Sequence, residues 1–298
     1  MQQHHTVLLK ESIDGLNLEP RDVVVDGTVG QGGHAALIAE RVGPHGTVLM
    51  LDADESSLAA AKERLAEANT HLIYVHGNFR AIKEHAARAG ITSADGILFD
   101  LGWHQGQMES GRGFSFREDA PLLMTLTTNP EPYQVTAADI IGNWNEDELV
   151  TLFREYGGER FAGRIARTIV ETRVRRPITT SKQLADVVQS AVPGKFRGGR
   201  IHPATKVFQA LRIAVNDELE ALKEGIASAL QLLAPNGRLA IITFHSLEDK
   251  IVKEAFKQAA VDGMGTLITK KPTVPGRSEV LVNRRARSAK LRIFQKHA

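Results

Sequence analysis

The chain has 298 residues, with 37 Lys or Arg, 35 Asp or Glu, and no cysteine. This length can bury the core of one large domain or two smaller ones, and the lack of cysteine excludes disulfides, thiol catalysis and cysteine-ligated metal. No apolar run approaches the roughly 20 residues of a membrane-spanning helix, and the N-terminus lacks the basic and apolar regions of a signal peptide. We therefore expect a cytoplasmic protein without membrane association.

The positive charge is concentrated in two segments. Residues 154–206 hold twelve Lys or Arg against four acids, and residues 270–296 hold nine against one, so the rest of the chain carries −14. Clustered cations are typical of proteins that contact a nucleic-acid backbone, although such runs often form only a solvated surface. Both interpretations stay open for each segment at this point.

A strand, a glycine-rich turn and a helix form the first clear pattern. Residues 23–26 are Val-Val-Val-Asp, four glycines follow within residues 27–33, and an alanine-rich helix is predicted over 35–42. Glycines let backbone N–H groups and the positive end of the next helix approach a ligand closely. We predict a ligand-binding turn. Asp26 is either a partner for a ligand amino group or a residue that only caps the turn.

A second predicted strand, over 47–52, ends on Asp52, 25 residues beyond Gly27. Nucleotide-binding folds place a carboxylate near this position to accept hydrogen bonds from ribose hydroxyls. The loop reads Gly-x-Gly-Gly rather than Gly-x-Gly-x-x-Gly, and S-adenosylmethionine fits that pattern better than NAD. An NAD-dependent oxidoreductase is further disfavoured because the chain has no Tyr-x-x-x-Lys pair.

Strands and helices continue to alternate up to Asp100. A helix is predicted over 55–68, a strand over 71–76, a helix over 82–89 and a strand over 94–100. This alternation predicts an α/β fold with a doubly wound parallel sheet, whose strand carboxyl ends carry the site.

The alternation stops after Asp100 for about a hundred residues. A long glycine-containing loop over 102–117 precedes helices predicted over 137–142, 146–155, 159–172 and 181–190, the last with Ser181 as N-cap. In the third helix, Arg160, Arg164 and Arg167 recur at i, i+4 and i+7 on one face. Basic surface on a helical insert indicates a macromolecular substrate.

The chain then returns to the sheet. Apolar residues at spacings of three and four from 207 to 233 predict one long helix or two in tandem, followed by a strand over 238–244. Ser246 and Asp249 resemble a capping box for a helix over 251–260, which leaves His245 as a candidate site residue. Residues 284–293 are predicted to be a basic edge strand. These elements divide the chain into an α/β domain, residues 1–105 and 206–298, and an insert, residues 106–205.

Several ordered segments together resemble the bacterial cytosine-N4 methyltransferases of 16S ribosomal RNA, the RsmH/MraW family. The matching segments are residues 5–11, 26–34, 52–54, 78–79, 95–102, 112–116, 156–160, 202–206, 208–213, 244–249 and 287–292. The resemblance implies a Rossmann-like class I methyltransferase domain interrupted by a helical, RNA-binding domain. It also implies the 16S rRNA of the small ribosomal subunit as substrate and a possible homodimer.

The resemblance assigns the cofactor and its contacts. It implies that S-adenosylmethionine touches Gly32, Gly33, His34, Asp52, Phe79, Asp100 and Gln107. No metal is required. For RNA contacts, the candidates are Arg160, Arg164, Arg167, Lys206, Arg212 and Trp103.

Asp100 is the main catalytic candidate. A cytosine amino nitrogen is a weak nucleophile because its lone pair is conjugated with the ring, so a site must align it with the methyl donor and accept an amino hydrogen. Asp100 is placed for this, with His245 a weaker candidate, although Asp100 could instead only bind the cofactor. The target base must be unpaired or turned out of its stack.

Two segments depart from the family pattern. After Asp-Leu-Gly the family has a small apolar residue, two serines and a proline, where this chain has residues 103–106, Trp-His-Gln-Gly. The family's Leu-Asp-Met-Arg-Met-Asp run appears here as residues 122–127, Leu-Leu-Met-Thr-Leu-Thr. Trp103 either stacks on a base or fills the space of the serines. An alternative function is therefore a non-catalytic or retargeted RNA-binding ribosome-assembly factor of the same fold.

Overall fold

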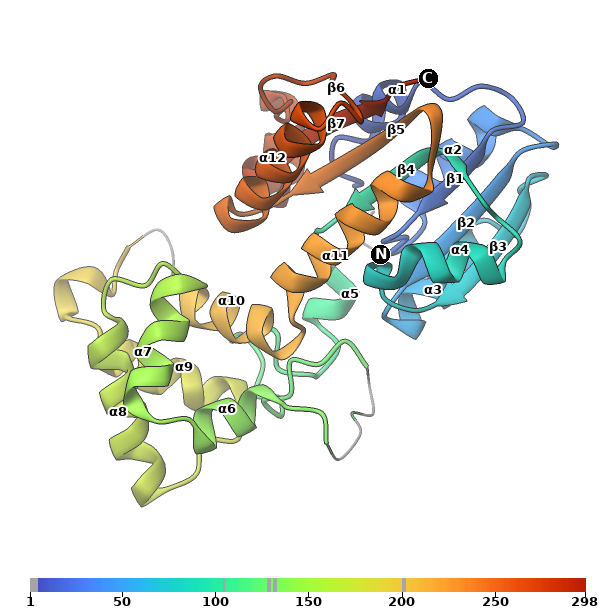
Figure 1. Cartoon of the computed structure of the whole chain (residues 1–298). Coiled ribbons are helices and arrows are strands. Elements are labelled where there is room, and N and C mark those ends of the chain that lie inside the picture. Colours follow the sequence, from blue (N-terminus) through green and yellow to red (C-terminus); the bar gives the residue numbers. More distant parts are fainter. Residues whose placement is uncertain (1–4, 104, 128–129, 131–132, 200–201) are drawn as a thin grey trace. The chain divides into compact units, whose positions relative to one another are not determined.

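The computed structural model describes residues 5–103, 105–127, 130, 133–199 and 202–298 (Figure 1). The chain forms two compact units, one of Met1–Gly102 with Leu219–Ala298, the sheet unit, and one of Trp103–Glu218, the helical unit. The insert therefore extends beyond the 106–205 expected from sequence. It includes the helix that follows residue 203, because that helix packs on other helices of the insert.

The sheet unit is built on a seven-stranded sheet in the order β3-β2-β1-β4-β5-β7-β6. The strands are β1 (Val23–Asp26), β2 (Thr47–Asp52), β3 (His71–His76), β4 (Ala94–Asp100), β5 (Leu233–Thr243), β6 (Gly265–Leu267) and β7 (Lys290–Lys296). The first five are parallel, which confirms the doubly wound α/β prediction. Chain order reverses between β1 and β4, and at such a switch point open α/β sheets bind ligands.

The predicted basic edge strand over 284–293 is wrong in its start and in its edge position, although its last residues do belong to strand β7. Residues Arg284–Ser288 form a short 3-10 helix, η3, and β7 pairs antiparallel with both β5 and β6, so it lies inside the sheet. The reason is that Ala286 and Ala289 are buried in the core, which turns this stretch onto the sheet face before the strand begins.

Helices cover both faces of the sheet (Figure 1). One face is covered by α1 (Leu9–Leu16), α2 (Gly33–Val42) and α3 (Glu55–Arg64), and the other by α4 (Ile82–Arg88), α11 (Glu218–Leu232) and α12 (Ser246–Val261). Successive strand residues alternate between the two cores, as Val24 and Val25 do in β1. The unit also contains η1 (Phe79–Ala81) and α13 (Arg277–Val282).

The helical unit has its own hydrophobic core. Its elements are α5 (Gln105–Met108), α6 (Ala137–Asn143), α7 (Glu146–Glu155), α8 (Ala162–Arg175), α9 (Ser181–Ala191), η2 (Gly194–Phe196) and α10 (Ala204–Val215). The tandem alternative for residues 207–233 is the observed one, because α10 and α11 are separate helices. Asp217, between them, has a positive φ of 48°.

Two local predictions in this unit need correction. The N-cap of α9 is Thr180, which forms a capping box with Gln183, whereas the Ser181 hydroxyl donates to the carbonyl of Glu118. Helix α8 begins at Ala162, so Arg160 precedes the helix and does not share its face with Arg164. Within the described part of the chain, no helix has the length and apolar character needed to cross a bilayer.

Candidate functional site

Three acidic residues end neighbouring parallel strands at the same edge of the sheet. Asp26 ends β1, Asp52 ends β2 and Asp100 ends β4. Parallel pairing in register brings the carboxyl ends of these strands together, so sequence analysis correctly identified them as neighbours. Their charges influence one another, because both Asp52 and Asp100 raise the pKa of Asp26.

Asp26 is buried and only half satisfied. Its Oδ1 accepts a hydrogen bond from the backbone N–H of Thr28 at 3.1 Å, whereas its buried Oδ2 has no hydrogen-bond partner among the described residues. Burial, with a smaller contribution from the two neighbouring carboxylates, raises the pKa of Asp26 to about 8. An orphaned buried carboxyl oxygen of this kind is suited to a cationic ligand group.

Asp52 holds the turn between β1 and α2. Its Oδ2 accepts from the N–H of Gly30 and its Oδ1 from the N–H of Asp54, each at 2.9 Å. Burial raises the pKa of Asp52 to about 6, although these two hydrogen bonds act in the opposite direction. Asp54 in turn caps α3 by accepting from the N–H of Ser56.

Asp100 lies at the end of β4, beside the glycine turn. Its N–H donates to the Thr28 hydroxyl at 2.6 Å, and its Oδ2 lies 3.6 Å from Nδ1 of His34. Burial raises the pKa of Asp100 to about 7, helped by the nearby carboxylate of Glu248 and opposed by a hydrogen bond from the N–H of Gly102. A carboxyl group with a pKa near neutrality can exchange a proton at working pH.

The glycine turn requires glycine at two positions for different reasons. Gly32 has a φ of +75°, and a Cβ there would lie 3.2 Å from the backbone of Ala61 on α3. At Gly33, the first residue of α2, a Cβ would lie 1.9 Å from the hydroxyl oxygen of Thr6. The turn is therefore closely packed between α3 and the N-terminal segment.

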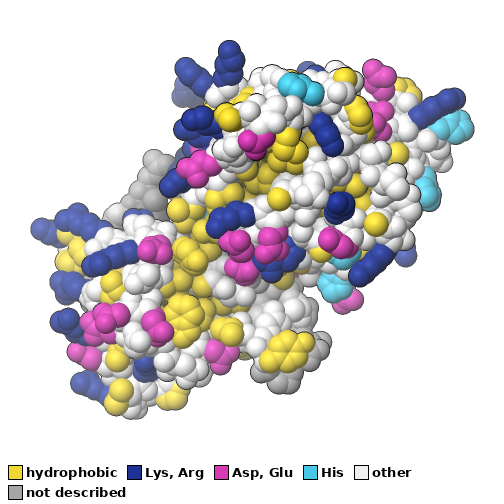
Figure 2. Space-filling model, in the orientation of Figure 1, with side chains coloured by type: hydrophobic (Ala, Val, Ile, Leu, Met, Phe, Trp, Pro, Cys, Tyr) yellow, Lys and Arg dark blue, Asp and Glu magenta, His cyan; other side chains and the backbone are white. Residues whose placement is uncertain are grey.

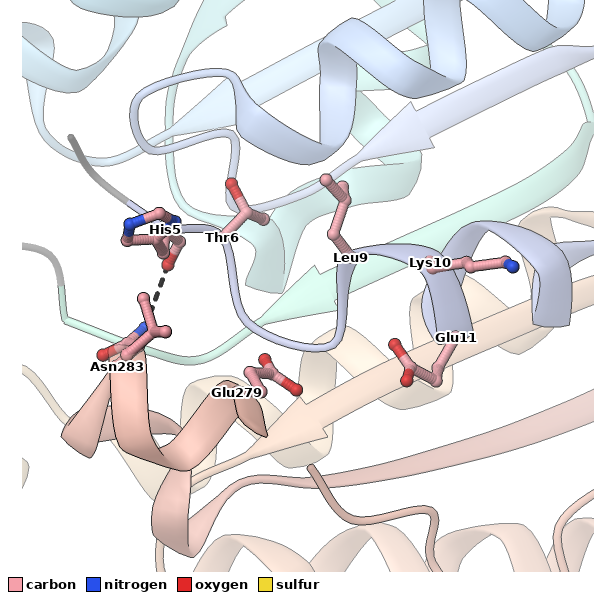
Figure 3. A pocket seen from close by; sticks show the side chains of 8 residues that line it. His5, Thr6, Leu9, Lys10, Glu11, Glu279 and Asn283 are labelled. Atoms are coloured by element: carbon pink, nitrogen blue, oxygen red, sulfur yellow. Dashed lines mark hydrogen bonds between the residues drawn. The ribbon is translucent and has the colours of Figure 1, made fainter. Parts of the chain in front are cut away.

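The N-terminal segment, residues 5–8, covers this turn. The carbonyl of Val7 lies 3.2 Å from Nε2 of His34, and the N–H of Leu8 donates to Glu279 of α13 at 2.8 Å. The Asn283 side chain donates to the carbonyl of His5 at 3.0 Å (Figure 3). The segment is thus held between the glycine turn and residues near the C-terminus.

A pocket of about 260 Å³ opens beside the N-terminal segment (Figure 3). It is lined by His5, Thr6, Leu9, Lys10, Glu11, Glu279, Val282 and Asn283. No sequence signal pointed to Glu279 or Asn283, because their contacts join residues more than 270 positions apart.

Phe79, the expected neighbour of adenine, follows β3 on η1. Its ring is partly buried and packs 4.9 Å, centroid to centroid, from the ring of Phe99. A Cβ added at Gly225 on α11 would lie 2.5 Å from the Phe79 ring, so this glycine makes room for it. Asn78 caps η1 by accepting from the N–H of Arg80, which fixes the position of Phe79 on the turn.

The capping interpretation of the segment after β5 was displaced by one residue. His245, not Ser246, is the N-cap of α12, and it forms a capping box with Glu248 rather than Asp249. Nε2 of His245 lies 3.0 Å from Oε1 of Glu248, whose Oε2 accepts from the N–H groups of Phe244 and His245. Histidine is an unusual N-cap, and this hid Glu248 from the sequence analysis.

Asp249 has a different role. Its two carboxylate oxygens accept from Lys290 at 2.8 Å and Arg292 at 2.7 Å, both on β7. These hydrogen bonds and positive charges hold the pKa of Asp249 below its usual value, although burial opposes them. Asp249 therefore joins α12 to the sheet.

Two further candidates, Trp103 and Gln107, belong to the helical unit. The Trp103 ring lies 4.4 Å from the Phe114 ring, and the Arg212 guanidinium lies 4.9 Å from its centroid. This packing agrees with the space-filling interpretation of Trp103. Gln107 is buried on α5. In the divergent 103–106 segment, His104 lies outside the described residues.

Several of the proposed RNA-binding cations already have partners within the helical unit. Arg212 forms a bidentate ion pair with Glu218, Lys206 donates to the carbonyl of Gly158, and Arg167 pairs with Glu146 at 3.4 Å. In Figure 2, Lys and Arg side chains of this unit stand among Asp and Glu side chains. The basic character of residues 154–206 is therefore partly compensated.

Arg160 and Arg164 remain exposed. Arg160 lies over the rings of Phe161 and Phe196, at 5.3 and 5.0 Å from their centroids. Arg164 and Arg167 lie three positions apart on α8 and share a face of it, whereas Arg160 lies before the helix. Arg167 is engaged by Glu146.

The divergent segment 122–127 is part of the core of the helical unit, not a surface loop that could hold a base. Leu122, Met124 and Thr125 are almost completely buried. The Asn216 amide donates to the carbonyl of Met124 at 2.8 Å, and the Arg112 guanidinium donates to the carbonyls of Thr125 and Leu126. Of the positions that differ from the family run in charge, only Thr125, which stands where the family has Arg, is almost completely buried; Leu123 and Thr127, which stand where the family has acids, are half-buried.

Comparison with known proteins gives consistent matches over the whole chain. A family model described as the MraW methylase family matches residues 1–297. A ribosomal RNA small subunit methyltransferase H from Syntrophotalea carbinolica is 44% identical over 310 residues, which cover 99% of this chain and 98% of that relative. A protein of the same name from Oceanobacillus iheyensis is 41% identical, covering 99% of this chain and 95% of that relative.

The solved structures include a distant match, an rRNA methylase from Streptococcus thermophilus. It is 12% identical, with a TM-score of 0.46, and the match covers 99% of this chain and 100% of that one.

Proposed function

The chain belongs to the MraW methylase family, and from that premise we propose that it transfers a methyl group from S-adenosylmethionine to the N4 amino group of a cytidine in 16S ribosomal RNA. It is an S-adenosylmethionine-dependent methyltransferase of the small-subunit RNA. The observation that carries the chemistry is the set of three carboxyl groups around one glycine turn, those of Asp26, which is buried, and of Asp100 and Asp52, which are partly buried; their pKa values are raised to about 8, 7 and 6.

The residues at this edge fit S-adenosylmethionine. The ligand would bring an ammonium and a sulfonium to an edge that holds the buried Asp26 and the partly buried Asp52 and Asp100. Asp26 would take the amino group with its orphaned Oδ2. Asp52 would accept from the ribose diol, and Phe79 would pack beside adenine.

The methionine end would lie on the turn formed by Gly32, Gly33 and His34. The closely packed glycines bring backbone N–H groups of the turn and of the α2 terminus near the ligand. His34 is oriented by the carbonyl of Val7, which leaves its Nδ1 toward Asp100. Gln107 is a further proposed contact, from the helical unit.

Asp100 would perform the proton chemistry. When bound, S-adenosylmethionine supplies a methyl group that is activated by the attached sulfonium. As the cytosine amino nitrogen bonds to the methyl carbon and the carbon–sulfur bond breaks to leave a neutral thioether, the Asp100 carboxylate would accept a proton from that nitrogen. Burial, helped by the carboxylate of Glu248, raises the pKa of Asp100, which makes Asp100 a stronger base than an ordinary aspartate.

His245 has a positioning role in this scheme. It caps α12 together with Glu248 and so holds the Glu248 carboxylate near Asp100. Replacing Asp100 while keeping its shape therefore tests the chemistry more directly than replacing His245.

The RNA would present an unpaired cytidine, and the exposed Arg160 and Arg164 of the helical unit are proposed to contact its backbone. The protein is proposed to act in the cytoplasm on the small subunit or its RNA. A homodimer is also proposed from the family resemblance, and light scattering of the purified protein checks it.

The function is tested by incubating the protein with radiolabelled S-adenosylmethionine and small subunits that lack the modification, then identifying the labelled nucleoside. Labelled N4-methylcytidine is the expected product. If the protein binds the cofactor but labels nothing, it is the non-catalytic assembly factor instead. For Asp100→Asn, we expect kcat to fall at least 100-fold with cofactor affinity changed less than tenfold. An equal loss of both would make Asp100 only a cofactor ligand.

A further inference from the structure

The basic residues near the C-terminus divide into two groups. Of the nine Lys and Arg in residues 270–296, Lys290 and Arg292 bind Asp249, and Lys296 donates to the carbonyls of Leu230 and Leu233. The other six are exposed, and no side-chain hydrogen bond or ion pair joins them to any described residue. They are Lys270, Lys271, Arg277, Arg284, Arg285 and Arg287.

Three of these six cations lie on one short helical turn that is capped and anchored. Arg284, Arg285 and Arg287 belong to η3, which Asn283 caps and which Ala286 and Ala289 anchor in the core. Residues at i and i+3 of a 3-10 helix lie one above the other, so Arg284 and Arg287 share a face. Like charges held together without acidic partners repel one another, which makes the turn suited to an external anion.

The two lysines are also held in place. The N–H groups of Ile268 and Thr269 donate to the carbonyl of Ile293, and Thr273 bridges to Leu291, so both ends of the Lys270–Lys271 turn are tied to β7. We call the six exposed cations together the C-terminal basic surface. Glu279 is the one acid in residues 270–296, and it is engaged by the N–H of Leu8.

The C-terminal basic surface adjoins the N-terminal segment, residues 5–8, which covers the glycine turn. Asn283, next to Arg284, holds the carbonyl of His5, and the segment from His5 leads to the Val7 contact with His34 (Figure 3). The neighbouring pocket is lined by Glu11 and Glu279 but also by Lys10 and His5, so its charges are mixed. The unpaired positive charge of this region is therefore on the C-terminal basic surface, where an RNA backbone would meet it.

We infer that the C-terminal basic surface is a phosphate-binding part of the RNA interface on the sheet unit itself. This inference rests on the proposed function for the choice of RNA as the occupant. Flexible, charged arginine and lysine side chains without structural partners match a repeating phosphate backbone in charge. The sheet unit would thus bind the RNA backbone on the face of the sheet that carries α2 and the glycine turn.

The main test neutralises the arginines of η3. The variant Arg284→Gln/Arg285→Gln/Arg287→Gln is compared with Arg88→Gln/Lys253→Gln/Lys257→Gln, which removes the same charge from exposed positions on α4 and α12, on the opposite face of the sheet. Binding of protein-free 16S RNA is measured between 50 and 200 mM salt, the range over which such contacts are resolved.

We expect the η3 variant to bind about 10²-fold more weakly at 0.1 M salt, with the salt slope reduced by about 2 to 3, since each phosphate contact contributes about 0.7–0.9 to that slope. The control variant should change affinity by less than threefold. Equal losses in both variants would make net charge the cause and overturn the inference. Unchanged RNA binding by the η3 variant would overturn the inference as well. A loss of binding seen only with intact subunits, and not with protein-free RNA, would also overturn it, because the surface would then contact a ribosomal protein.

A second test uses the exposed Val282, which lines the pocket beside the arginines. Val282→Glu should weaken RNA binding about tenfold and Val282→Lys should strengthen it, whereas equal effects of both would contradict an electrostatic surface. Cofactor affinity is measured on every variant, and an unchanged affinity shows that the variant is folded. If the wild type binds RNA through this surface but labels no cytidine, the proposed function fails and the inference stands. If the wild type labels cytidine and the variants bind RNA normally, the inference fails and the proposed function stands.

Discussion

Replacing Asp26 by Asn should change the stability of the cofactor-free protein in opposite directions at low and high pH. The Asp26 carboxyl has a pKa of about 8 in the folded chain, against 3.8 for an ordinary Asp. A raised folded pKa means that Asp26 contributes full stability below about pH 4, and that this contribution is lost progressively as pH rises through 8. An amide cannot ionise, so the variant loses this dependence.

The size follows from the shift. Each pKa unit corresponds to about 1.36 kcal/mol, so the free-energy cost of keeping Asp26 buried grows by roughly 4 kcal/mol between pH 5 and pH 8. The new amide leaves N–H groups without acceptors near the orphaned Oδ2 position, which costs about 1–3 kcal/mol at any pH. At pH 5 the ionisation cost is already about 1.6 kcal/mol and offsets most of the amide cost, so we expect Asp26→Asn to change stability by at most about 1 kcal/mol at pH 5 and to stabilise by about 2–4 kcal/mol at pH 8.

Denaturant unfolding of both proteins at pH 5, 6, 7 and 8 measures this difference, with far-ultraviolet circular dichroism as the probe. Because Asp52 and Asp100 titrate in both proteins, the difference between the two proteins reports the ionisation of Asp26 together with its coupling to these neighbours. A difference that varies by less than about 1 kcal/mol over this range would refute the assignment of a protonated, buried Asp26.

Cofactor binding provides an independent measurement for Asp26. If its carboxylate takes the ammonium of S-adenosylmethionine, binding at pH 7 should release about one proton from the wild type and fewer from Asp26→Asn. Calorimetry in two buffers of different ionisation enthalpy counts these protons. The affinity should fall about 10- to 100-fold in the variant, as expected for a hydrogen bond to a charged group. Unchanged proton release would mean that Asp26 only caps the turn.

Gly33→Ala should destabilise the protein by about 1–3 kcal/mol and weaken cofactor binding, because the new Cβ would lie 1.9 Å from the Thr6 hydroxyl oxygen. The control is Gly142→Ala, where the added Cβ would meet open space. It should leave the free energy of unfolding equal or higher in the same assay. Equal losses in the two would show that the contact with Thr6 is not the cause. Glu248→Gln keeps an acceptor for the N-cap but removes a charge that raises the pKa of Asp100, so the acidic limb of the pH profile of methyl transfer should move to lower pH. A profile that does not move, or moves to higher pH, would show that the ionisation of Asp100 does not set it.

Much of the sheet unit could be predicted from sequence because its signals are local. Apolar β-branched runs that end on an acid predicted β1, β2 and β4 and the ends of their strands, and glycines after β1 predicted the turn. The carboxyl-edge position of Asp26, Asp52 and Asp100 then followed from parallel pairing alone. The family resemblance added the cofactor, the RNA and the residues implied to bind them.

Errors arose where neighbouring residues offered equivalent local chemistry. At α12, Ser246 and His245 could each begin the helix, and backbone geometry selected His245 with Glu248. At α9, Thr180 was selected over Ser181 for the same reason. Hydrogen-bonding residue types indicate that a helix begins nearby, but the cap is the residue whose backbone leaves the helix, and that depends on packing.

The sequence by itself determined the order and type of the elements and the carboxyl groups at their ends, since these depend on residues close together in the chain. Only the tertiary structure decided which charges are free. It assigned Lys290 and Arg292 to Asp249 and left Arg284, Arg285 and Arg287 exposed, although all five lie in one basic run. The physical reason is that pairing, burial and pKa depend on partners brought close by folding from distant parts of the chain, and charge counts along a sequence contain no information about those distances.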